Sequence, residues 1–417
     1  MKRVLFALAV GLAAAGPLAV EARPQPKYVE LFDDLARTVQ ANFYDPHFHG
    51  VNWSEVTQRY RRRLKDVRDD QQFLRLGEDM LAELKSSHVH LRPPGGSAAS
   101  AVGIGVDFRR IGQDWVVTHV ELLSDARRQG IRPGDVLMSP REELGGEMGS
   151  IASPRLRTCA GEEKVLAVRR EGGFWPPAKP NLRWSKIRPE PGKTIGYIRA
   201  DRFDDGAAEL ADQAMADLGQ TDGLIIDVRD NSGGNASALR LASYFSEGAF
   251  PSVVLLTRPY LERLGPPVTA ADALAAPRLD RAYTTDRVLG GLAQHGGVAL
   301  WTEDVGDKRY TKPVVVLINE ETGSAAEGFA WHMRLKTHAH LIGRRTAGAL
   351  LSGETFDLAY GWKVVVPTAG NWAPDGQNYG DRAVPPHLVT PQSRADLCAG
   401  RDPDLDAAMD RLLGRVR

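Results

Sequence analysis

Cysteine is scarce in this chain, and neither sign of charge is in excess. The 417 residues include two cysteines, and 53 basic and 53 acidic side chains cancel to a formal net charge of zero. This balance argues against the broad basic surface with which proteins bind nucleic acid. Beyond the first residues, no apolar run is long enough to cross a bilayer. Nucleic-acid binding and stable membrane insertion are therefore not expected.

The composition is instead that of a globular protein. Apolar residues make up 42% of the chain and charged residues 25%, ordinary values for a protein that builds a core. The length suits two or three domains, and the chain contains no internal repeat or low-complexity tract.

The first 22 residues have the pattern of a secretion signal. The basic pair Lys2 and Arg3 precedes an apolar stretch from Leu5 to Ala15, and the small residue Ala22 suits cleavage after it. We therefore expect this segment to be a signal peptide and the mature chain to be soluble and exported, to the periplasm or the extracellular space. A buried N-terminal helix is the alternative.

Export bears on the two cysteines. In an oxidising compartment Cys159 and Cys398 could form a disulfide. Two cysteines alone leave a disulfide and free thiols equally open.

Residues 23–95 are predicted to be a helical domain. The segment QQFLRLGEDMLAELK places Phe73, Leu76, Met80 and Leu84 three or four residues apart, which is the period of a helix with one buried face. The stretch YDPHFHGVNW interrupts the helices with an Asp-Pro turn signal. The stretch SSHVHLRPPGGS then ends them.

Residues 100–172 alternate like β-strands. GIGVDFRRIGQDWVVTHV has the pattern of two strands around a turn. VGIGV resembles the carboxylate-binding loop of a PDZ domain, and SDARRQGIRPGDVL resembles its most recognisable segment. The resemblance implies a groove that adds a peptide as an extra strand, with loop residues Gly103, Ile104, Gly105 and Val106 holding its terminal carboxylate. A purely structural β-rich spacer is the alternative.

Residues 185–417 alternate between strand and helix. TIGYIRADRF, GLIIDV and PVVVLI are strand patterns, and each precedes a helical segment. Runs of four apolar residues indicate strands buried on both faces, and thus an α/β core with a largely parallel sheet. Residues 257–300, rich in proline and alanine, are expected to be a peripheral insertion.

One serine stands where a strand turns into a helix, in INEETGSAAEGFAWHM. A side chain there is exposed at the rim of the sheet, and the N–H groups after it have no helical partner. Ser324 could attack a carbonyl carbon while the Ala325 N–H stabilises the oxyanion. A serine that only caps the helix would give the same pattern.

Two other motifs favour catalysis. RDNSGGN follows the strand GLIIDV and could present the N–H of Gly233, or of Gly234, as a second oxyanion donor. It lacks the Gly-Lys-Ser/Thr of a phosphate loop. His88, just past a helix end in KSSHVHL, is a candidate base. His88 and His90 could also begin a metal site, but no third ligand stands out, so neither a metal nor a cofactor is expected.

Taken together, the motifs resemble the serine peptidase family of carboxy-terminal processing peptidases and the tricorn core protease. From about residue 28 to residue 412 the quoted segments, with LIGRRTAG and DPDLDAAM, follow the order of that family. The resemblance implies a ClpP- and crotonase-like αβ superhelix core, an N-terminal helical bundle and a PDZ-like domain.

The family has two branches, which differ in the base. The processing branch pairs the serine with a lysine, but this chain has Ala349 at that place. Arg344 and Arg345 are nearby, but arginine is a poor base. The tricorn-like branch takes a histidine from the helical region, which AELKSSHV matches. The resemblance thus implies Ser324 as nucleophile, His88 as base and Ser87 as the neighbour that orients it. It also implies the N–H groups of Ala325 and of a glycine as oxyanion donors, with Gly233 preferred to Gly234.

The tricorn-like branch also uses a glutamate in a Glu-x-x-Gly-Val-x-Pro segment. Here the segment is GDRAVPP, with Gly380 in place of the glutamate and Asp381 one step later. Asp381 could fill the role after a small shift, or this member of the site could be missing. Glu327 and Glu354 are weaker substitutes.

We therefore expect an exported serine peptidase that hydrolyses peptide bonds through an acyl-enzyme. Its partner would be a peptide or protein substrate, with the PDZ-like domain holding substrate tails or gating the site. A catalytically inactive peptide- or ligand-binding protein on the same scaffold is the first alternative, and an esterase or amidase is the second. The sequence is silent on the natural substrate and on the oligomeric state.

Overall fold

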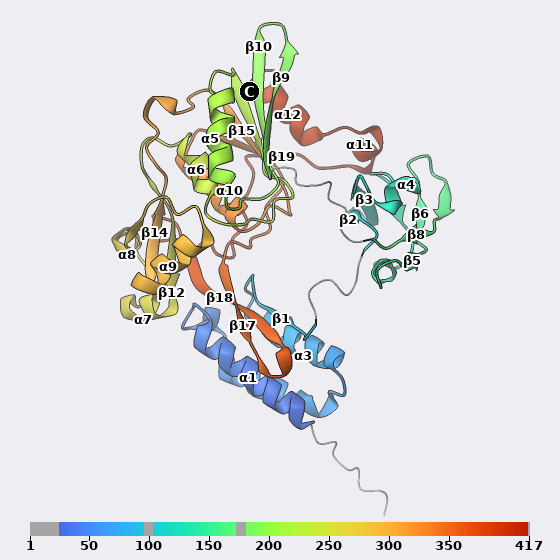
Figure 1. Ribbon diagram of the computed structural model, residues 1–417, viewed down its shortest axis with the longest axis vertical. Helices are drawn as coiled ribbons and strands as arrows, with labels where there is room; N and C mark the ends of the chain where they lie inside the picture. Colours follow the sequence, from blue (N-terminus) through green and yellow to red (C-terminus); the bar gives the residue numbers. More distant parts are fainter. Residues whose placement is uncertain (1–24, 96–102, 172–180, 416–417) are drawn as a thin grey trace, which may run out of the picture.

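The computed structural model describes residues 25–95, 103–171 and 181–415. We call these the helical unit, the β-rich unit and the core (Figure 1). The predicted signal peptide lies outside the described residues. Among the helices of the described ranges, none is both long and apolar enough to cross a bilayer.

The helical unit packs against a sheet of the core and shares its hydrophobic interior. Its elements are α1 (Pro26–Asn42), η1 (Phe48–Gly50), α2 (Trp53–Arg61), η2 (Arg62–Asp66), α3 (Asp70–Ala82) and β1 (His90–Arg92). Phe32 and Phe73 from the helices lie in one apolar cluster with Trp362 and Val364 of the core. The helix period predicted from the sequence is therefore present, and its buried face meets the core.

The β-rich unit has its own small hydrophobic cluster, which includes Ile104, Val117 and Ile131. Its elements are β2 (Val106–Ile111), β3 (Asp114–Val120), α4 (Asp125–Arg128), β4 (Val136–Leu137), η3 (Arg141–Leu144), β5 (Ile151–Ala152), β6 (Arg155–Arg157), β7 (Glu163–Val165) and β8 (Val168–Arg169). One sheet has the order β2-β3-β4-β6-β7, so β2 is an edge strand.

The core contains the predicted parallel sheet, in the order β19-β16-β15-β11-β10-β9. Its strands are β9 (Leu182–Glu190), β10 (Lys193–Ala200), β11 (Gly223–Asp227), β15 (Val314–Ile318), β16 (His340–Gly343) and β19 (Leu388–Val389). All neighbours are parallel except β9 and β10. The helices that cover it are α5 (Ala207–Leu218), α6 (Ala238–Ser243), α10 (Ala325–Lys336) and α12 (Pro403–Leu412), while α11 (Arg394–Ala399) lies beside the β-rich unit.

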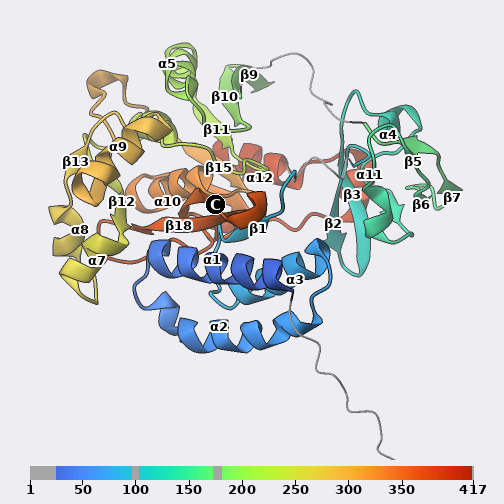
Figure 2. The same cartoon turned by 60° about the horizontal axis from the view of Figure 1, so that its bottom comes forward.

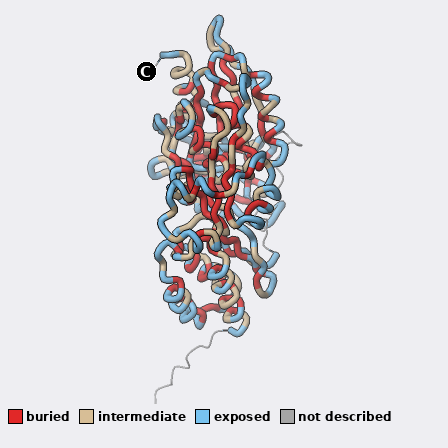
Figure 3. Tube along the Cα trace, turned by 90° about the vertical axis from the view of Figure 1, so that its left-hand side faces the viewer, coloured by how far each residue is buried: buried red, intermediate tan, exposed pale blue. Residues whose placement is uncertain are grey.

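Strand β15 shows why its sequence is apolar throughout. Val314, Val316 and Ile318 face the cluster under α5, α6 and α10. Val315 and Leu317 face the opposite cluster, under α12. Because successive strand residues point to opposite faces, a sheet covered on both sides needs an unbroken apolar run. Figure 3 shows the buried trace along the middle of the molecule.

A second, mixed sheet joins the core to the helical unit and has the order β1-β18-β12-β14-β13, with β17 also on β18. The core contributes the strands β12 (Pro251–Thr257), β13 (Arg278–Leu279), β14 (Gly297–Trp301), β17 (Ser352–Asp357) and β18 (Lys363–Trp372) to this sheet. The helices between these strands in the chain are α7 (Arg258–Leu264), α8 (Ala270–Ala275), α9 (Thr285–His295), η4 (Gly306–Lys308) and η5 (Ala359–Gly361). The β17–β18 ribbon reaches the helices in Figures 1 and 2.

This sheet corrects the prediction for residues 257–300. They are not peripheral, because β14 pairs with β12 inside the sheet and α9 packs beside it. Pro and Ala in this stretch occupy short helices and their ends rather than an external loop.

Candidate active site

Ser324 precedes the first residue of α10, as the strand-to-helix pattern predicts, but its hydroxyl does not cap the helix. Its φ of 49° and ψ of −125° differ from those of a helix-capping residue. The Ser324 N–H donates to the Ala349 carbonyl at 2.9 Å. Among the hydrogen bonds of the described residues, none uses the Ser324 hydroxyl. The capping alternative is therefore wrong, and this oxygen is available.

Two backbone N–H groups beside Ser324 also lack partners within the described ranges: those of Ala325 and Gly234. Gly233 packs so tightly that a Cβ on it would lie 2.5 Å from the Ser324 Cβ. Its N–H, however, donates to the Asn231 side chain at 2.8 Å. The preference for Gly233 is therefore wrong: of the two predicted glycines, Gly234 is the one whose N–H has no partner among the described residues, and it lines the cavity described below.

His88 lies in the helical unit, in a turn between α3 and β1, with φ 59°. Its Nδ1 lies 3.3 Å from the Ser87 hydroxyl oxygen. Asp381 accepts from the Ser87 N–H at 2.8 Å and from the Ser86 hydroxyl at 3.4 Å. Asp381 therefore holds the turn that carries His88; no hydrogen bond between this carboxylate and the imidazole occurs among the described residues.

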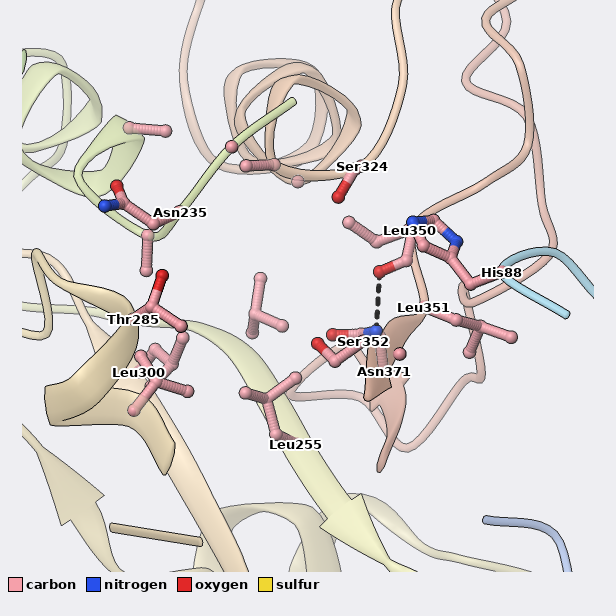
Figure 4. A pocket seen from close by; sticks show the side chains of 18 of the residues that line it. His88, Asn235, Leu255, Thr285, Leu300, Ser324, Leu350, Leu351, Ser352 and Asn371 are labelled. Atoms are coloured by element: carbon pink, nitrogen blue, oxygen red, sulfur yellow. Dashed lines mark hydrogen bonds between the residues drawn. The ribbon is translucent and has the colours of Figure 1, made fainter. Parts of the chain in front are cut away.

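Ser324 and His88, far apart in the sequence, line the same cavity of about 380 Å³. Figure 4 shows the serine hydroxyl and the imidazole ring on one side of this space. No hydrogen bond links the two in the described part of the chain. Most of the remaining wall is apolar and comes from several elements: Leu239, Val253, Leu255, Leu289, Leu292, Leu300, Phe329, Leu350 and Leu351.

The imidazole is suited to accept a proton. Burial lowers the pKa of His88 below its ordinary value, and the nearby His90 acts in the same direction. The negative charge of Asp381 opposes both effects. A lowered pKa keeps the ring neutral near neutral pH, the form that can act as a base.

Relatives of the chain point to one peptidase family. Residues 194–390 match peptidase family S41, and residues 24–82 match the tricorn protease C1 domain. A carboxyl-terminal-processing protease of Synechocystis is 23% identical over 405 aligned positions, covering 91% of this chain and 86% of the relative. Tricorn protease homolog 1 of Streptomyces coelicolor is 23% identical over 93% of this chain, but the chain spans only 35% of that protein.

The fold is also that of a solved protease. The structure of the photosystem II D1 C-terminal processing protease superposes with a TM-score of 0.56 and 20% identity, covering 90% of this chain and 97% of the other. Residues 194–390, just under half of the chain, match peptidase family S41. The resemblance drawn from the motifs and the enzyme class, a serine-type peptidase, are thereby confirmed.

In this peptidase, Glu327 has a structural role beside Ser324 that its position in the sequence does not reveal. Its buried carboxylate accepts from the N–H groups of Gly348 and Ala349 at 2.7 and 2.6 Å, and from the Thr346 hydroxyl. Burial raises the pKa of this carboxyl. Because Ala349 in turn holds Ser324, Glu327 ties the helix of the serine to the adjacent loop. Glu354, the other weak substitute, accepts from Thr368 at 2.8 Å.

The remaining predicted residues lie elsewhere. Gly103, Ile104, Gly105 and Val106 precede or begin β2 in the β-rich unit, and Gly105 accepts from the Glu121 N–H at 2.9 Å. They do not line the Ser324 cavity. No group of three or more His, Cys, Asp or Glu side chains within the described ranges could hold a metal ion.

Sequence reasoning missed Asn231 and α9. The side chain of Asn231 occupies the Gly233 N–H and so decides which glycine is free. Its position two residues before the glycine is the spacing of an Asx turn, a signal that was present in RDNSGG. No comparable signal marks α9 as a cavity wall.

Proposed function

We propose that this chain is an exported serine endopeptidase with Ser324 as nucleophile and His88 as general base. The observation that carries the proposal is the shared cavity, in which a non-capping serine hydroxyl, a neutral imidazole and two unpaired N–H groups lie together. A serine hydroxyl needs both a base and a site for the oxyanion to react with an amide.

The reaction begins when His88 Nε2 takes the Ser324 proton and the serine oxygen attacks the substrate carbonyl carbon. The resulting oxyanion accepts hydrogen bonds from the N–H groups of Ala325 and Gly234. His88 then gives its proton to the leaving amine as the C–N bond breaks, and the acyl-enzyme forms. Water, deprotonated by His88, attacks the ester and releases the acid.

Ser87 and Asp381 orient the base in this proposal. An Nδ1–H that donates to the Ser87 oxygen fixes the tautomer in which Nε2 is free to accept a proton. Asp381 holds the Ser87 main chain and favours the imidazolium that forms during the reaction through its charge. Asp381 thus replaces the glutamate of the tricorn-like branch by an indirect contact. Serine-to-histidine hydrogen bonds are often long in unliganded enzymes and tighten when substrate binds.

The cavity sets the substrate class. Its apolar wall, beside the nucleophile, receives an apolar side chain on the acyl side of the cleaved bond. The β-rich unit binds an extended peptide tail or gates the site, supported by the open edge of β2 and the loop before it. Export is supported by the N-terminal pattern and by a disulfide between Cys159 and Cys398.

Covalent labelling tests the proposal. A fluorophosphonate probe should label the folded wild-type protein, and Ser324→Ala should abolish labelling while His88→Ala slows it at least about a hundredfold. His119→Ala, at an exposed histidine of the β-rich unit, is the matched control and should label normally. A folded wild-type protein that does not label, or a Ser324→Ala variant that still does, would contradict a catalytic role and favour a binding protein.

The type of bond is tested separately. A peptidase should cleave unstructured peptides with a kcat/KM that rises with peptide length, whereas an esterase or amidase should favour short-chain esters. Faster turnover of the esters at equal concentration would overturn the endopeptidase assignment.

A further inference from the structure

The β-rich unit is joined to the core by a covalent bond. Cys159, between β6 and β7, forms a disulfide with Cys398 in α11, across a sequence separation of 239 residues. Arg394 in α11 adds hydrogen bonds to the carbonyls of Gly134, at 2.9 Å, and Thr158, at 2.7 Å. Figures 1 and 2 both show α11 beside this unit. The two bodies are therefore fastened at this contact.

One arginine of the β-rich unit crosses the same interface toward the active site. Arg109 lies on β2, and its side chain is only 20% exposed. Its guanidinium donates to Gln392 at 3.1 Å, two residues before Arg394, and pairs with Glu320 at 3.3 Å and Asp230 at 3.9 Å. Arg199 also pairs with Asp230, and Arg344 with Glu320. Within the described ranges, Arg109 is the side chain that pairs with both carboxylates.

Those two carboxylates belong to the two loops that form the oxyanion site. Asp230 precedes the Asn231 turn that leads to Gly234, and its backbone holds a left-handed φ of 60°. Glu320 lies in the turn that leads to Ser324. Asn319 already links the loops, donating to the Asp230 carboxylate at 2.6 Å. A cation that pairs with a carboxylate of each loop offsets the repulsion between the two carboxylates, and so favours one position of the first loop relative to the second.

We propose that Arg109 is a positioning residue for catalysis, and that the Cys159–Cys398 disulfide keeps it in place. Arg109 holds the Asp230 loop and the Glu320 turn together so that the N–H groups of Gly234 and Ala325 point at the same oxygen. The inference rests on the proposed function of this cleft. Release of the β-rich unit from the core withdraws Arg109 and separates the two donors.

Kinetics of Arg109→Gln and of a Cys159→Ser/Cys398→Ser double variant test this role. Each should lower kcat about tenfold or more, with KM for a short peptide changed less than about threefold, because displaced donors weaken transition-state binding. Arg109→Lys, which keeps one charge, should recover part of the rate. Arg110→Gln, on the same strand but exposed, is the matched control and should match wild type.

The combination of changes separates positioning from general destabilisation. A reducing agent should lower wild-type kcat but change Arg109→Gln by less than about twofold, because the group that the disulfide holds is already absent. Equal losses on reduction in both proteins, a wild-type rate in Arg109→Gln, or an equal loss in Arg110→Gln would each overturn the proposal.

Hydrogen exchange provides a readout that needs no activity. Amides of residues 230–235 and 319–325 should exchange faster in Arg109→Gln than in wild type, while those of β15 should be unchanged. Unchanged exchange in both loops would overturn the positioning role even if the enzyme is active. Faster exchange in a protein that hydrolyses no peptide would instead support the clamp and contradict only the proposed function.

Discussion

At the residue scale, the two facing side chains of the cavity are carried by unusual backbone. Ser324 and His88 have φ values of 49° and 59°. Left-handed angles cost of order 1–3 kcal/mol for residues with a side chain and persist where the surroundings fix them. The surroundings here are the Ala349 carbonyl for Ser324 and the Asp381 carboxylate for the turn before His88. Because its angles are not those of a cap, the serine oxygen faces the cavity instead of the helix amides.

The Asp381 charge predicts the pH dependence of the enzyme. It raises the His88 pKa, so Asp381→Asn should lower that pKa further and move the acid limb of kcat/KM to lower pH. Asparagine keeps an oxygen that can accept from the Ser87 N–H, so the plateau value of kcat/KM above the acid limb should fall only a few-fold. Asp381→Ala should shift the limb equally and lower the plateau about tenfold or more, since the turn loses its acceptor.

A pH series of peptide hydrolysis with the three proteins provides the measurement. Asp375→Asn, an exposed carboxylate of the same region bonded only to Gln377, is the control. An acid limb that stays in place or moves to higher pH in both Asp381 variants would show that this charge does not act on the base.

Glu327 predicts a joint loss of stability and rate. Glu327→Ala leaves the Gly348 and Ala349 N–H groups and the Thr346 hydroxyl without their acceptor, which should lower the free energy of unfolding by roughly 3 kcal/mol. Glu327→Gln keeps one acceptor and should cost less. Urea unfolding and fluorophosphonate labelling would measure both effects. Labelling at the wild-type rate in a destabilised Glu327→Ala would show that the loop does not position Ser324.

At the element scale, the sequence predicts elements better than their partners. The apolar runs give the strands of the parallel sheet, because a strand covered on both faces must be apolar at every position. The second sheet pairs β12 with β14 and β18, which come from distant parts of the chain. The local sequence pattern of a strand does not show which distant strand it pairs with. Alanine-rich α8 and the short β13 are too brief to have a readable period, and so residues 257–300 looked peripheral.

Helix α9 predicts the size limit of the apolar subsite. Leu289 is 40% exposed and lines the cavity, so Leu289→Trp should narrow the subsite without disturbing the core. Peptides with a large apolar residue before the cleaved bond should lose about tenfold or more in kcat/KM, while those with alanine there change little. Competition between the two peptides in one reaction measures the ratio.

Leu274→Trp is the matched control, because Leu274 is 53% exposed on α8 and does not line the cavity. If the ratio of kcat/KM for the two peptides is unchanged in Leu289→Trp, the substrate side chain before the cleaved bond does not bind against Leu289. An equal change of the ratio in Leu289→Trp and Leu274→Trp would mean that the added surface hydrophobicity, and not a narrower subsite, causes the loss in kcat/KM.

At the scale of the whole molecule, the site is built at a junction. Ser324 and the proposed oxyanion donors come from the core, whereas the proposed base, His88, comes from the helical unit. Motifs identified both side chains from the sequence, but whether the units meet depends on packing between residues hundreds of positions apart. The choice between Gly233 and Gly234 likewise depends on where one Asn231 side chain points; the Asx-turn spacing in RDNSGG permits its hydrogen bond to Gly233 but does not fix it.

The docking of the helical unit can be altered at one glycine. Gly370 on β18 lies against the rings of Tyr44 and Trp372, and a Cβ on Gly370 would lie 2.4 Å from the Tyr44 ring and 2.6 Å from the Trp372 ring. Tyr44 also donates its N–H to Pro367 at 2.9 Å. Gly370→Ala should therefore force the helical unit away from the sheet. Overpacking of this kind costs about 1–3 kcal/mol. Since His88 moves with the unit, kcat should fall about tenfold or more.

A second substitution distinguishes displacement from simple loss of stability. Tyr44→Leu in the Gly370→Ala background removes the overlapping ring that belongs to the helical unit and leaves the overlap with Trp372 of the same strand, so it should restore part of kcat although it leaves a smaller core. Tyr44→Leu alone should lower stability by a few kcal/mol through the lost ring, with less effect on kcat. Thermal unfolding together with peptide turnover in the four proteins completes the cycle. If kcat followed stability alone, so that the double variant were slower than Gly370→Ala, the position of the helical unit would not control the base.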